Sequence, residues 1–202
     1  MPRSLLLKPV LIVLLAGAVA LAHADDWSVD GERSSVGFVT VKNGAVVESH
    51  RFRRVSGSVS ADGLARVSID LTSVDTMIPI RDGRMRDLLF ETGVFPTAEV
   101  SAEVDMPALL ALDPGEQSAA NITADLTIRG VTSPIGLDLA VIRGTEDRWV
   151  VTTTRDAVVF GESFGLGAGI EKLREIAGLA SITPNVAVSF SLVLGPASED
   201  GE

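Results

Sequence analysis

The sequence predicts an all-β domain of about eight strands behind a cleaved leader. Three observations predict it: apolar and polar residues alternate with a period of two, the links between these segments are short, and the amino-terminal residues follow a secretory pattern. The chain has 202 residues, of which 46% are hydrophobic, and this excludes a disordered chain. Its formal net charge of −10 argues against a protein that binds nucleic acid.

Residues 1–24 have the three parts of a secretory signal peptide. Two basic residues precede an apolar run at residues 10–21, and a small-x-small cleavage site follows at residues 22–24. The run is short for a bilayer span, so an uncleaved membrane anchor is the weaker alternative. Cleavage after Ala24 leaves 178 residues with a net charge of −12. We therefore expect a soluble periplasmic protein without a stable membrane anchor.

Eight segments of the mature chain are predicted to be strands. Five alternate strictly, at residues 64–73, 97–105, 121–129, 135–141 and 186–194. Three alternate less regularly, at residues 34–42, 45–60 and 148–159. Asn43-Gly44 is a strong hairpin signal, and residues 61–63 and 129–134 form two further tight links. Strands with one apolar face each form either a sandwich or a closed barrel, and the alternation does not distinguish the two.

Two segments have the periodicity of helices, at residues 80–91 and 168–177. The apolar side of the first is formed by Met85, Leu88 and Leu89, and that of the second by Ile170, Leu173, Ile176 and Ala177. Gly93 and Pro96 end the first helix, and Gly178 is placed to cap the second. Each helix precedes a strand, so each is expected to close one end of a barrel. Residues 197–202 are predicted to be an acidic flexible tail.

Residues that carry catalysis or bind metals are scarce. The chain has no Cys, which excludes thiol nucleophiles and Cys-based metal sites. His50 is the only His of the mature chain, and its polar neighbours predict a surface position. We therefore predict no enzyme, no catalytic residue and no metal site. A carboxylate-dependent enzyme that acts on a lipid-linked substrate through Asp75, Asp82 or Asp87 is a minor alternative, because nothing in the sequence brings these residues together.

Two arginine clusters allow two interpretations. The clusters are Arg51, Arg53 and Arg54, and Arg81, Arg84 and Arg86. They either contact anionic headgroups or a membrane surface, or pair with carboxylates on a solvated face. The candidate carboxylates are Glu48, Asp82, Asp87 and Glu91. The acidic net charge favours ion pairing.

Four motifs, in order, resemble those of the YceI-like family. They are the opening segment at residues 27–38, the S-V-D-T to F-P segment at residues 73–96, L-T-I-R-G-V-T at residues 126–132, and F-G-L at residues 164–166. The resemblance covers residues 27–194. Arg33 stands where the family often has His. Residues 167–183 resemble a subgroup that is associated with ubiquinone-type ligands.

The resemblance implies an extended eight-stranded antiparallel β-barrel, similar to the lipocalins, over residues 25–196, with two short helices near the barrel ends. It also implies a periplasmic protein that holds a long isoprenoid in its lumen for transport or storage. The ligand would be a polyprenyl chain or an isoprenoid quinone such as ubiquinone, and no other cofactor is required. Transient contact with a membrane or a respiratory protein stays open, as do monomer and homodimer. A ligand-free interaction or stress module is the alternative to lipid binding.

Aliphatic rows that the alternation turns inward are the candidate ligand-binding residues. The predicted lumen residues are Val36, Phe38, Val67, Ile69, Val100, Leu126, Ile128, Leu137, Leu139, Val188, Phe190 and Leu192. The predicted residues at the barrel ends are Met85, Leu88, Leu89, Phe90, Phe164, Ile170 and Leu173. A register error of one residue would move a whole row to the outer face.

Overall fold

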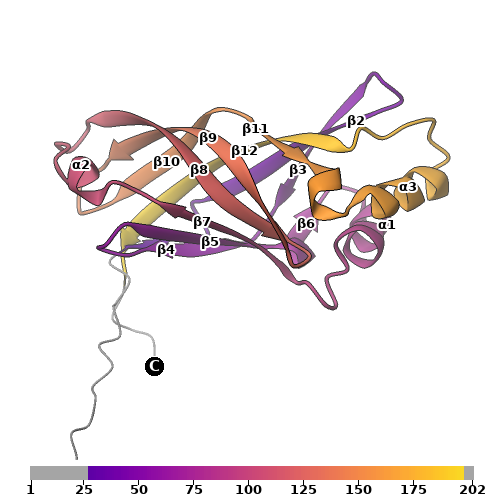
Figure 1. Cartoon of the computed structure of the whole chain (residues 1–202), viewed down its shortest axis with the longest axis horizontal. Coiled ribbons are helices and arrows are strands. Elements are labelled where there is room, and N and C mark those ends of the chain that lie inside the picture. The colour runs from indigo at the N-terminus through magenta and orange to yellow at the C-terminus, as the bar shows by residue number, and fades with distance from the viewer. Residues whose placement is uncertain (1–26, 198–202) are drawn as a thin grey trace, which may run out of the picture.

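The computed structural model describes residues 27–197, and strands predominate there (Figure 1). The predicted leader and nearly all of the predicted tail lie outside the described residues. Within 27–197, no helix has the length and apolar character needed to cross a membrane.

Twelve strand segments follow one another along the described chain. They are β1 (Trp27–Val29), β2 (Ser35–Lys42), β3 (Val46–Phe52), β4 (Val55–Val59), β5 (Leu64–Asp70), β6 (Val74–Asp75), β7 (Thr97–Glu103), β8 (Gln117–Ile128), β9 (Val131–Arg143), β10 (Trp149–Arg155), β11 (Ala157–Phe160) and β12 (Asn185–Pro196). The helices and helical turns are η1 (Leu71–Ser73), α1 (Pro79–Arg84), η2 (Met85–Phe90), α2 (Met106–Leu110), η3 (Gly161–Phe164) and α3 (Gly167–Ile176).

These segments form a closed antiparallel barrel of eight strands, as the sequence predicts. Four of the eight strands are each broken into two segments: β1 continues as β2, β3 as β4, β5 as β6, and β10 as β11. The pairing shows this, because β12 has β1 and β2 along one edge and β10 and β11 along the other. Each strand pairs with the next in chain order, and β12 pairs with β1 to close the ring.

Two tight turns join neighbouring strands. Asn43 and Gly44 have φ values of 52° and 69°, and the Ala45 N–H donates to the Lys42 carbonyl oxygen at 3.2 Å. This is the two-residue hairpin that the sequence predicts. Arg129 and Gly130, with φ values of 51° and 74°, form a second one. The predicted link at residues 129–134 is therefore too long, because residues 131–134 belong to β9.

Two predicted strands are interrupted near Ser73, which lies far from one of them in the sequence. The Ser73 Oγ accepts the backbone N–H groups of Arg53 and Arg54 at 3.1 Å each, where the predicted strand at residues 45–60 divides into β3 and β4. The Asp70 carboxylate accepts a backbone N–H of η1 at 2.8 Å, which ends β5 before the predicted strand does. Both breaks arise because side-chain oxygens take N–H groups from the ladder.

Two further departures concern short segments. The predicted strand at residues 148–159 divides into β10 and β11 after a register shift between Thr153 and Arg155. The three residues of β1 are too few to show an alternation, and the sequence does not predict this strand. In the structure β1 matters, because it pairs with both β4 and β12 and so closes the barrel.

The helices α1 and α3 lie together at one end of the barrel, and the expectation that each closes a separate end is wrong (Figure 1). The predicted helix at residues 80–91 forms α1 and then the π-helical turn η2. α3 packs directly on η2, because a Cβ atom at Gly169 would lie 2.6 Å from the Leu88 carbonyl oxygen. A larger residue would separate the two elements.

Helix α3 presents only half of its predicted apolar stripe to the barrel. Ile170 and Leu173 are half-buried, whereas Ile176 is 48% exposed and Ala177 is exposed. The reason is that the helix ends here: Gly178 has a φ of 65°, and the Leu179 N–H donates back to the Arg174 carbonyl oxygen at 3.0 Å. The apolar stripe of α3 therefore extends beyond the part of the helix that packs against the barrel.

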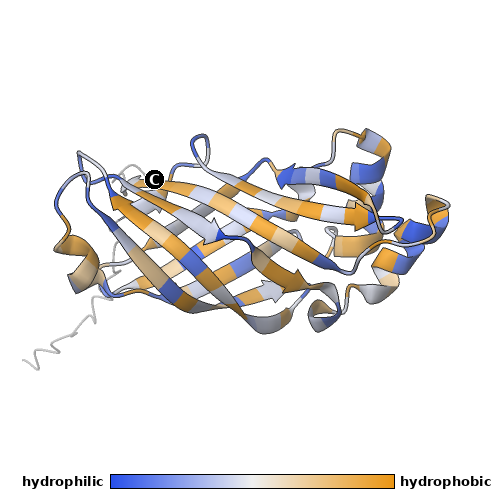
Figure 2. Cartoon of the chain, turned by 90° about the horizontal axis from the view of Figure 1, so that it is seen from above, coloured by the Kyte–Doolittle hydropathy of each residue, from blue (hydrophilic) through white to orange (hydrophobic). Residues whose placement is uncertain are grey.

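The opposite end of the barrel carries α2, which the periodicity of the sequence does not predict. Its cap is Asp105, whose carboxylate accepts the Ala108 N–H at 3.1 Å, and its first residue, Met106, is 4% exposed. Apolar and polar residues alternate along the strands between the two ends (Figure 2). The buried apolar rows face the barrel interior, where the core and a cavity lie.

Candidate functional site: an apolar cavity through the barrel

An apolar cavity of about 950 Å³ runs inside the barrel from α3 and η2 at one end to α2 at the other. Inward-facing side chains of all eight strands line it. All twelve predicted lumen residues are among them: Val36, Phe38, Val67, Ile69, Val100, Leu126, Ile128, Leu137, Leu139, Val188, Phe190 and Leu192. Their contact with a ligand stays a prediction.

Five of the seven residues predicted at the barrel ends also line the cavity, namely Met85, Leu89, Phe90, Ile170 and Leu173. Leu88 and Phe164 do not. Phe164 is 2% exposed and packs within the core, and Leu88 meets α3 through its backbone. Both departures follow from the π-helical turn and the short η3, which helical periodicity does not predict.

Two tryptophans line the α2 end of the cavity, and neither is among the residues predicted to bind a ligand. The rings of Trp27 and Trp149 meet edge to face, with centroids 6.5 Å apart and an interplanar angle of 89°. The Arg143 guanidinium lies 5.5 Å from the centroid of the Trp149 ring. Leu109 of α2 packs against the same cluster. The alternation in residues 148–159 could have predicted that Trp149 faces the lumen. Trp149 lies two residues before Val151, and so on the same face of the strand.

Polar side chains gather at the end of the cavity near α1. They are Thr40, Lys42, Glu48, His50, Arg81 and Arg84. The Glu48 Oε2 accepts from Lys42 Nζ and from Arg81 Nη1, at 2.8 Å each. The hydrogen bond from Lys42, with the charge of Arg81, holds the pKa of Glu48 below its usual value. This carboxylate therefore stays ionised between two cations.

Two arginines of this polar end differ in how firmly they are held. Arg81 donates from Nε to the Thr76 Oγ1 at 2.8 Å and from Nη2 to the Thr76 carbonyl oxygen at 2.7 Å. Thr76 is itself fixed, because its N–H donates to the Asp82 carboxylate at 2.9 Å. Arg84 lines the cavity and has no ion pair or side-chain hydrogen bond within residues 27–197. Its guanidinium is available to a ligand.

His50 is buried in the cavity wall, so the predicted surface position is wrong. Its side chain is 8% exposed, and its ring centroid lies 5.1 Å from that of Phe38. Nε2 is 2.9 Å from the Thr40 Oγ1, whereas the buried Nδ1 has no hydrogen-bond partner within residues 27–197. Burial, followed by the charge of Arg81, lowers the pKa of His50. His50 is therefore neutral at pH 7.

The pH dependence of stability tests this burial. In the unfolded chain His50 titrates near 6.5, and in the folded protein its pKa lies lower. The stability contributed by neutral His50 is therefore complete above about pH 6.5 and is lost as the pH falls through the folded pKa. Urea unfolding at about pH 7.5 and about pH 5.5 should show a smaller loss of stability for His50→Gln than for the wild type.

The titration of the carboxylates does not affect this comparison of stability between about pH 7.5 and about pH 5.5. Glu48 and Asp70 have lowered pKa values, so their stabilising contributions are lost only below their unfolded values of 4.5 and 3.8. Equal losses in the wild type and in His50→Gln would mean that His50 is not buried as described.

The first arginine cluster forms ion pairs, as its favoured interpretation holds, but with other carboxylates than those expected. Arg51 and Arg53 each donate from Nε to the Asp75 Oδ2 at 3.1 Å, and Arg54 donates from Nε to Asp70 at 2.8 Å. A hydrogen bond from the Met77 N–H and those of the two arginines lower the pKa of Asp75. A carboxyl group held in its ionised form is a poor general acid.

The other two candidate carboxylates occupy separate surroundings. Asp82 accepts from Thr76, and Asp87 is exposed on η2. Within residues 27–197 no group of three or more His, Asp or Glu residues is arranged to hold a metal ion.

A closed eight-stranded β-barrel with an apolar lumen and a polar end has the architecture of the lipocalin-like barrels. The chain matches the model of the YceI-like domain over residues 27–194, and it belongs to that family. A UPF0312 protein of Vibrio campbellii is 31% identical over 146 residues, which cover 67% of this chain and 74% of the relative. The family predicted from the motifs is thus confirmed.

Two solved structures extend the comparison. A polyisoprenoid-binding domain from Saccharophagus degradans, implicated in plant cell wall breakdown, superposes with a TM-score of 0.83 at 38% sequence identity. The match covers 86% of this chain and 99% of that one. BcnA of Burkholderia cenocepacia has a TM-score of 0.63 at 22% identity, with coverage of 82% and 98%, and it shares the fold.

Proposed function

We propose that this chain is an exported periplasmic protein that binds a long isoprenoid in its barrel for transport or storage. The ligand is a polyprenyl chain or an isoprenoid quinone such as ubiquinone. The observation that carries this proposal is the continuous apolar cavity with polar groups at its ends. The Saccharophagus domain supports it, since that domain binds polyisoprenoids and its fold covers nearly all of the described barrel.

The energetics of such a lumen suit a chain-like hydrocarbon. Burial contributes about 0.8 kcal/mol for each CH₂ group, so several isoprene units contribute more than about 10 kcal/mol before the costs of ordering. Aliphatic side chains in the cavity wall provide this free energy of burial without hydrogen bonds to the ligand. The lumen therefore selects for an apolar chain, and the headgroup must be selected elsewhere.

The polar end near α1 is the proposed place of the headgroup. Lys42, Arg81 and Arg84 outnumber Glu48 there, and His50 is neutral, so this end favours oxygen acceptors such as quinone carbonyls or phosphate oxygens. The buried Nδ1 of His50 has no hydrogen-bond partner among the described residues and would be satisfied by a ligand atom.

The substitution Arg84→Gln tests the headgroup site. A hydrogen bond to a charged group contributes about 1.5–3 kcal/mol, so the affinity for a polyprenyl phosphate should fall about tenfold or more. The affinity for squalene, which has no headgroup, should stay the same. Arg66→Gln is the matched control, because Arg66 is exposed on β5 and does not line the cavity. An equal loss for squalene and the phosphate would contradict the assignment.

The proposed function is tested by mass spectrometry of a solvent extract of the protein, purified from a bacterial periplasm without detergent. We expect a stoichiometric isoprenoid, and the intact mass of the protein should place its first residue at Asp25. An extract that stays clean after incubation with ubiquinone and polyprenol would instead support the ligand-free interaction module.

The enzymatic alternative has less support. Asp75 is held ionised by two arginines, Asp82 is engaged by Thr76, and Asp87 is exposed. Membership of the YceI-like family and the likeness to a polyisoprenoid-binding domain also favour binding over catalysis. Turnover of a lipid-linked substrate that is lost in Asp82→Asn would overturn this view.

A further inference from the structure

The strand ladder of the barrel is short between β7 and β8 near α2, as it also is between β3 and β6, and β9 has no strand partner beside β11 in the described part of the chain. β8 pairs with β9 along all twelve of its residues, from Gln117 to Ile128. Its other edge pairs with β7 over three residues only, from Glu99 to Ser101. The part of β8 from residue 117 to residue 124 therefore has no strand partner on the β7 side.

The cavity reaches this gap. Along most strands only alternate residues line the cavity, because every second side chain points outward. At the gap two unbroken runs line it, residues 102–106 and residues 118–122. These runs include outward-facing, exposed residues of both strands: Glu103, Ala119 and Asn121. A cavity meets consecutive residues of a strand where it passes along the strand's edge.

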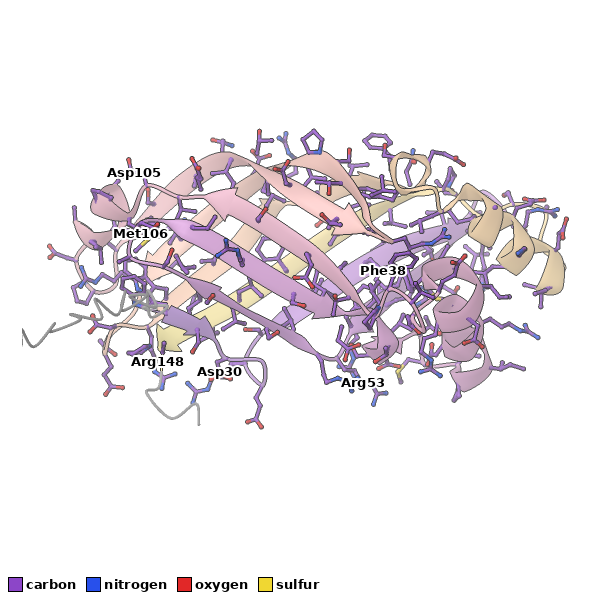
Figure 3. The ribbon with its side chains drawn as sticks, turned by 60° about the horizontal axis from the view of Figure 1, so that its bottom comes forward. Asp30, Phe38, Arg53, Asp105, Met106 and Arg148 are labelled. Atoms are coloured by element: carbon purple, nitrogen blue, oxygen red, sulfur yellow. The ribbon has the colours of Figure 1, made fainter. Side chains whose placement is uncertain are left out.

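The gap lies at the far end of the cavity from the polar headgroup end. Asp105 and Met106 mark it at the end that carries α2, whereas Phe38 lies toward α1 and α3 (Figure 3). Met106, Ala108 and Leu109 of α2 line the cavity beside it. The gap thus offers apolar contacts on one side and a free strand edge on the other.

We infer that the gap between β7 and β8 is a second opening of the lumen, through which the distal end of a long isoprenoid chain leaves the barrel. This inference rests on the proposed function and adds the class of ligand: chains longer than the barrel. The twelve residues of β8 rise about 40 Å, and a tilt of about 35–45° shortens this to about 30 Å along the barrel axis. A closed lumen would limit the isoprenoid chain to that length, and an opening near α2 removes this limit.

The charges at the two ends of the cavity set the direction of the ligand. Glu103 and Asp105 line the cavity at the gap, whereas Lys42, Arg81 and Arg84 line the other end. An anionic or acceptor headgroup is repelled at the gap and attracted near α1. The chain therefore enters the gap with its apolar end.

Narrowing the gap tests the inference with two probes, geranylgeraniol as the short chain and undecaprenol as the long one. Ala119→Phe and Asn121→Phe place a larger side chain at the edge of the gap, because both residues are exposed there. Both variants should bind geranylgeraniol like the wild type and bind undecaprenol at least about tenfold more weakly. Ser189→Phe, on the exposed outer face of β12, should bind both probes like the wild type.

Hydrogen exchange of the unaltered protein gives a second measurement that needs no variant. Undecaprenol should slow the exchange of amides in residues 118–123, and geranylgeraniol should leave it unchanged. Unchanged exchange with bound undecaprenol, or wild-type affinity of the Phe variants for undecaprenol, would overturn the second opening. Failure of the wild type to bind either probe would overturn the proposed function instead.

Discussion

The substitution Leu139→Asp should unfold the protein or abolish ligand retention. Leu139 lies on β9 with 6% of its surface exposed, and its side chain lines the cavity. In the part of the chain that the structure describes, Leu139 packs in an apolar cluster with Ala124, Leu137 and Ala157. An uncompensated buried carboxylate costs about 3–5 kcal/mol, which is a large part of the roughly 5–15 kcal/mol by which a domain is stable. Urea unfolding and extraction of bound lipid measure the two outcomes.

The control carries the same change on the outer face of the barrel. Val158 lies on β11 with 51% of its surface exposed and does not line the cavity. Val158→Asp should therefore change the free energy of unfolding by less than about 0.5 kcal/mol and leave the ligand bound. A Leu139→Asp protein that folds and keeps its lipid would show that Leu139 does not face the lumen.

The substitution Trp149→Ala should lower the free energy of unfolding by about 3–5 kcal/mol. Trp149 is 5% exposed, its ring meets that of Trp27 edge to face, and the Arg143 guanidinium stacks on it. Its strand, β10, pairs with β12, and β12 also pairs with β1 where the barrel closes. Loss of the ring therefore opens a void where the barrel closes.

Two related variants separate the contributions. Trp149→Phe keeps an aromatic ring in the cluster and should cost less. Trp27→Ala removes the same edge-to-face contact, but from a residue that is only half-buried, and should also cost less. A loss below about 1 kcal/mol for Trp149→Ala would mean that the cluster does not hold the seam together.

The sequence predicts the parts of the fold that depend on local patterns. Alternation identifies the inward rows, such as those with Leu137 and Leu139, because one face of each strand is buried. Asn43-Gly44 identifies its hairpin, because both residues must adopt positive φ. The family motifs decide between a barrel and a sandwich, which the alternation cannot do.

The features that the sequence does not predict depend on contacts between distant residues. Ser73 divides a strand about twenty residues earlier by taking its N–H groups. The polar neighbours of His50 in the sequence indicate a surface, whereas Phe38 and Thr40 of the adjacent strand bury it. The gap between β7 and β8 could be predicted only from the number of residues over which the two strands pair. None of these contacts leaves a periodic signal.

The rings of Trp27 and Trp149 at the α2 end allow ligand binding to be followed by the intrinsic fluorescence of the protein. The chain contains two Trp and no Tyr, so nearly all of its near-ultraviolet emission comes from Trp27 and Trp149, which lie side by side in the cavity. A hydrocarbon chain that replaces water there should shift the emission to shorter wavelength. A quinone ring bound near α1 would leave the intensity almost unchanged, whereas one bound near α2 would quench it. The emission spectrum therefore reads the orientation of the ligand without a label.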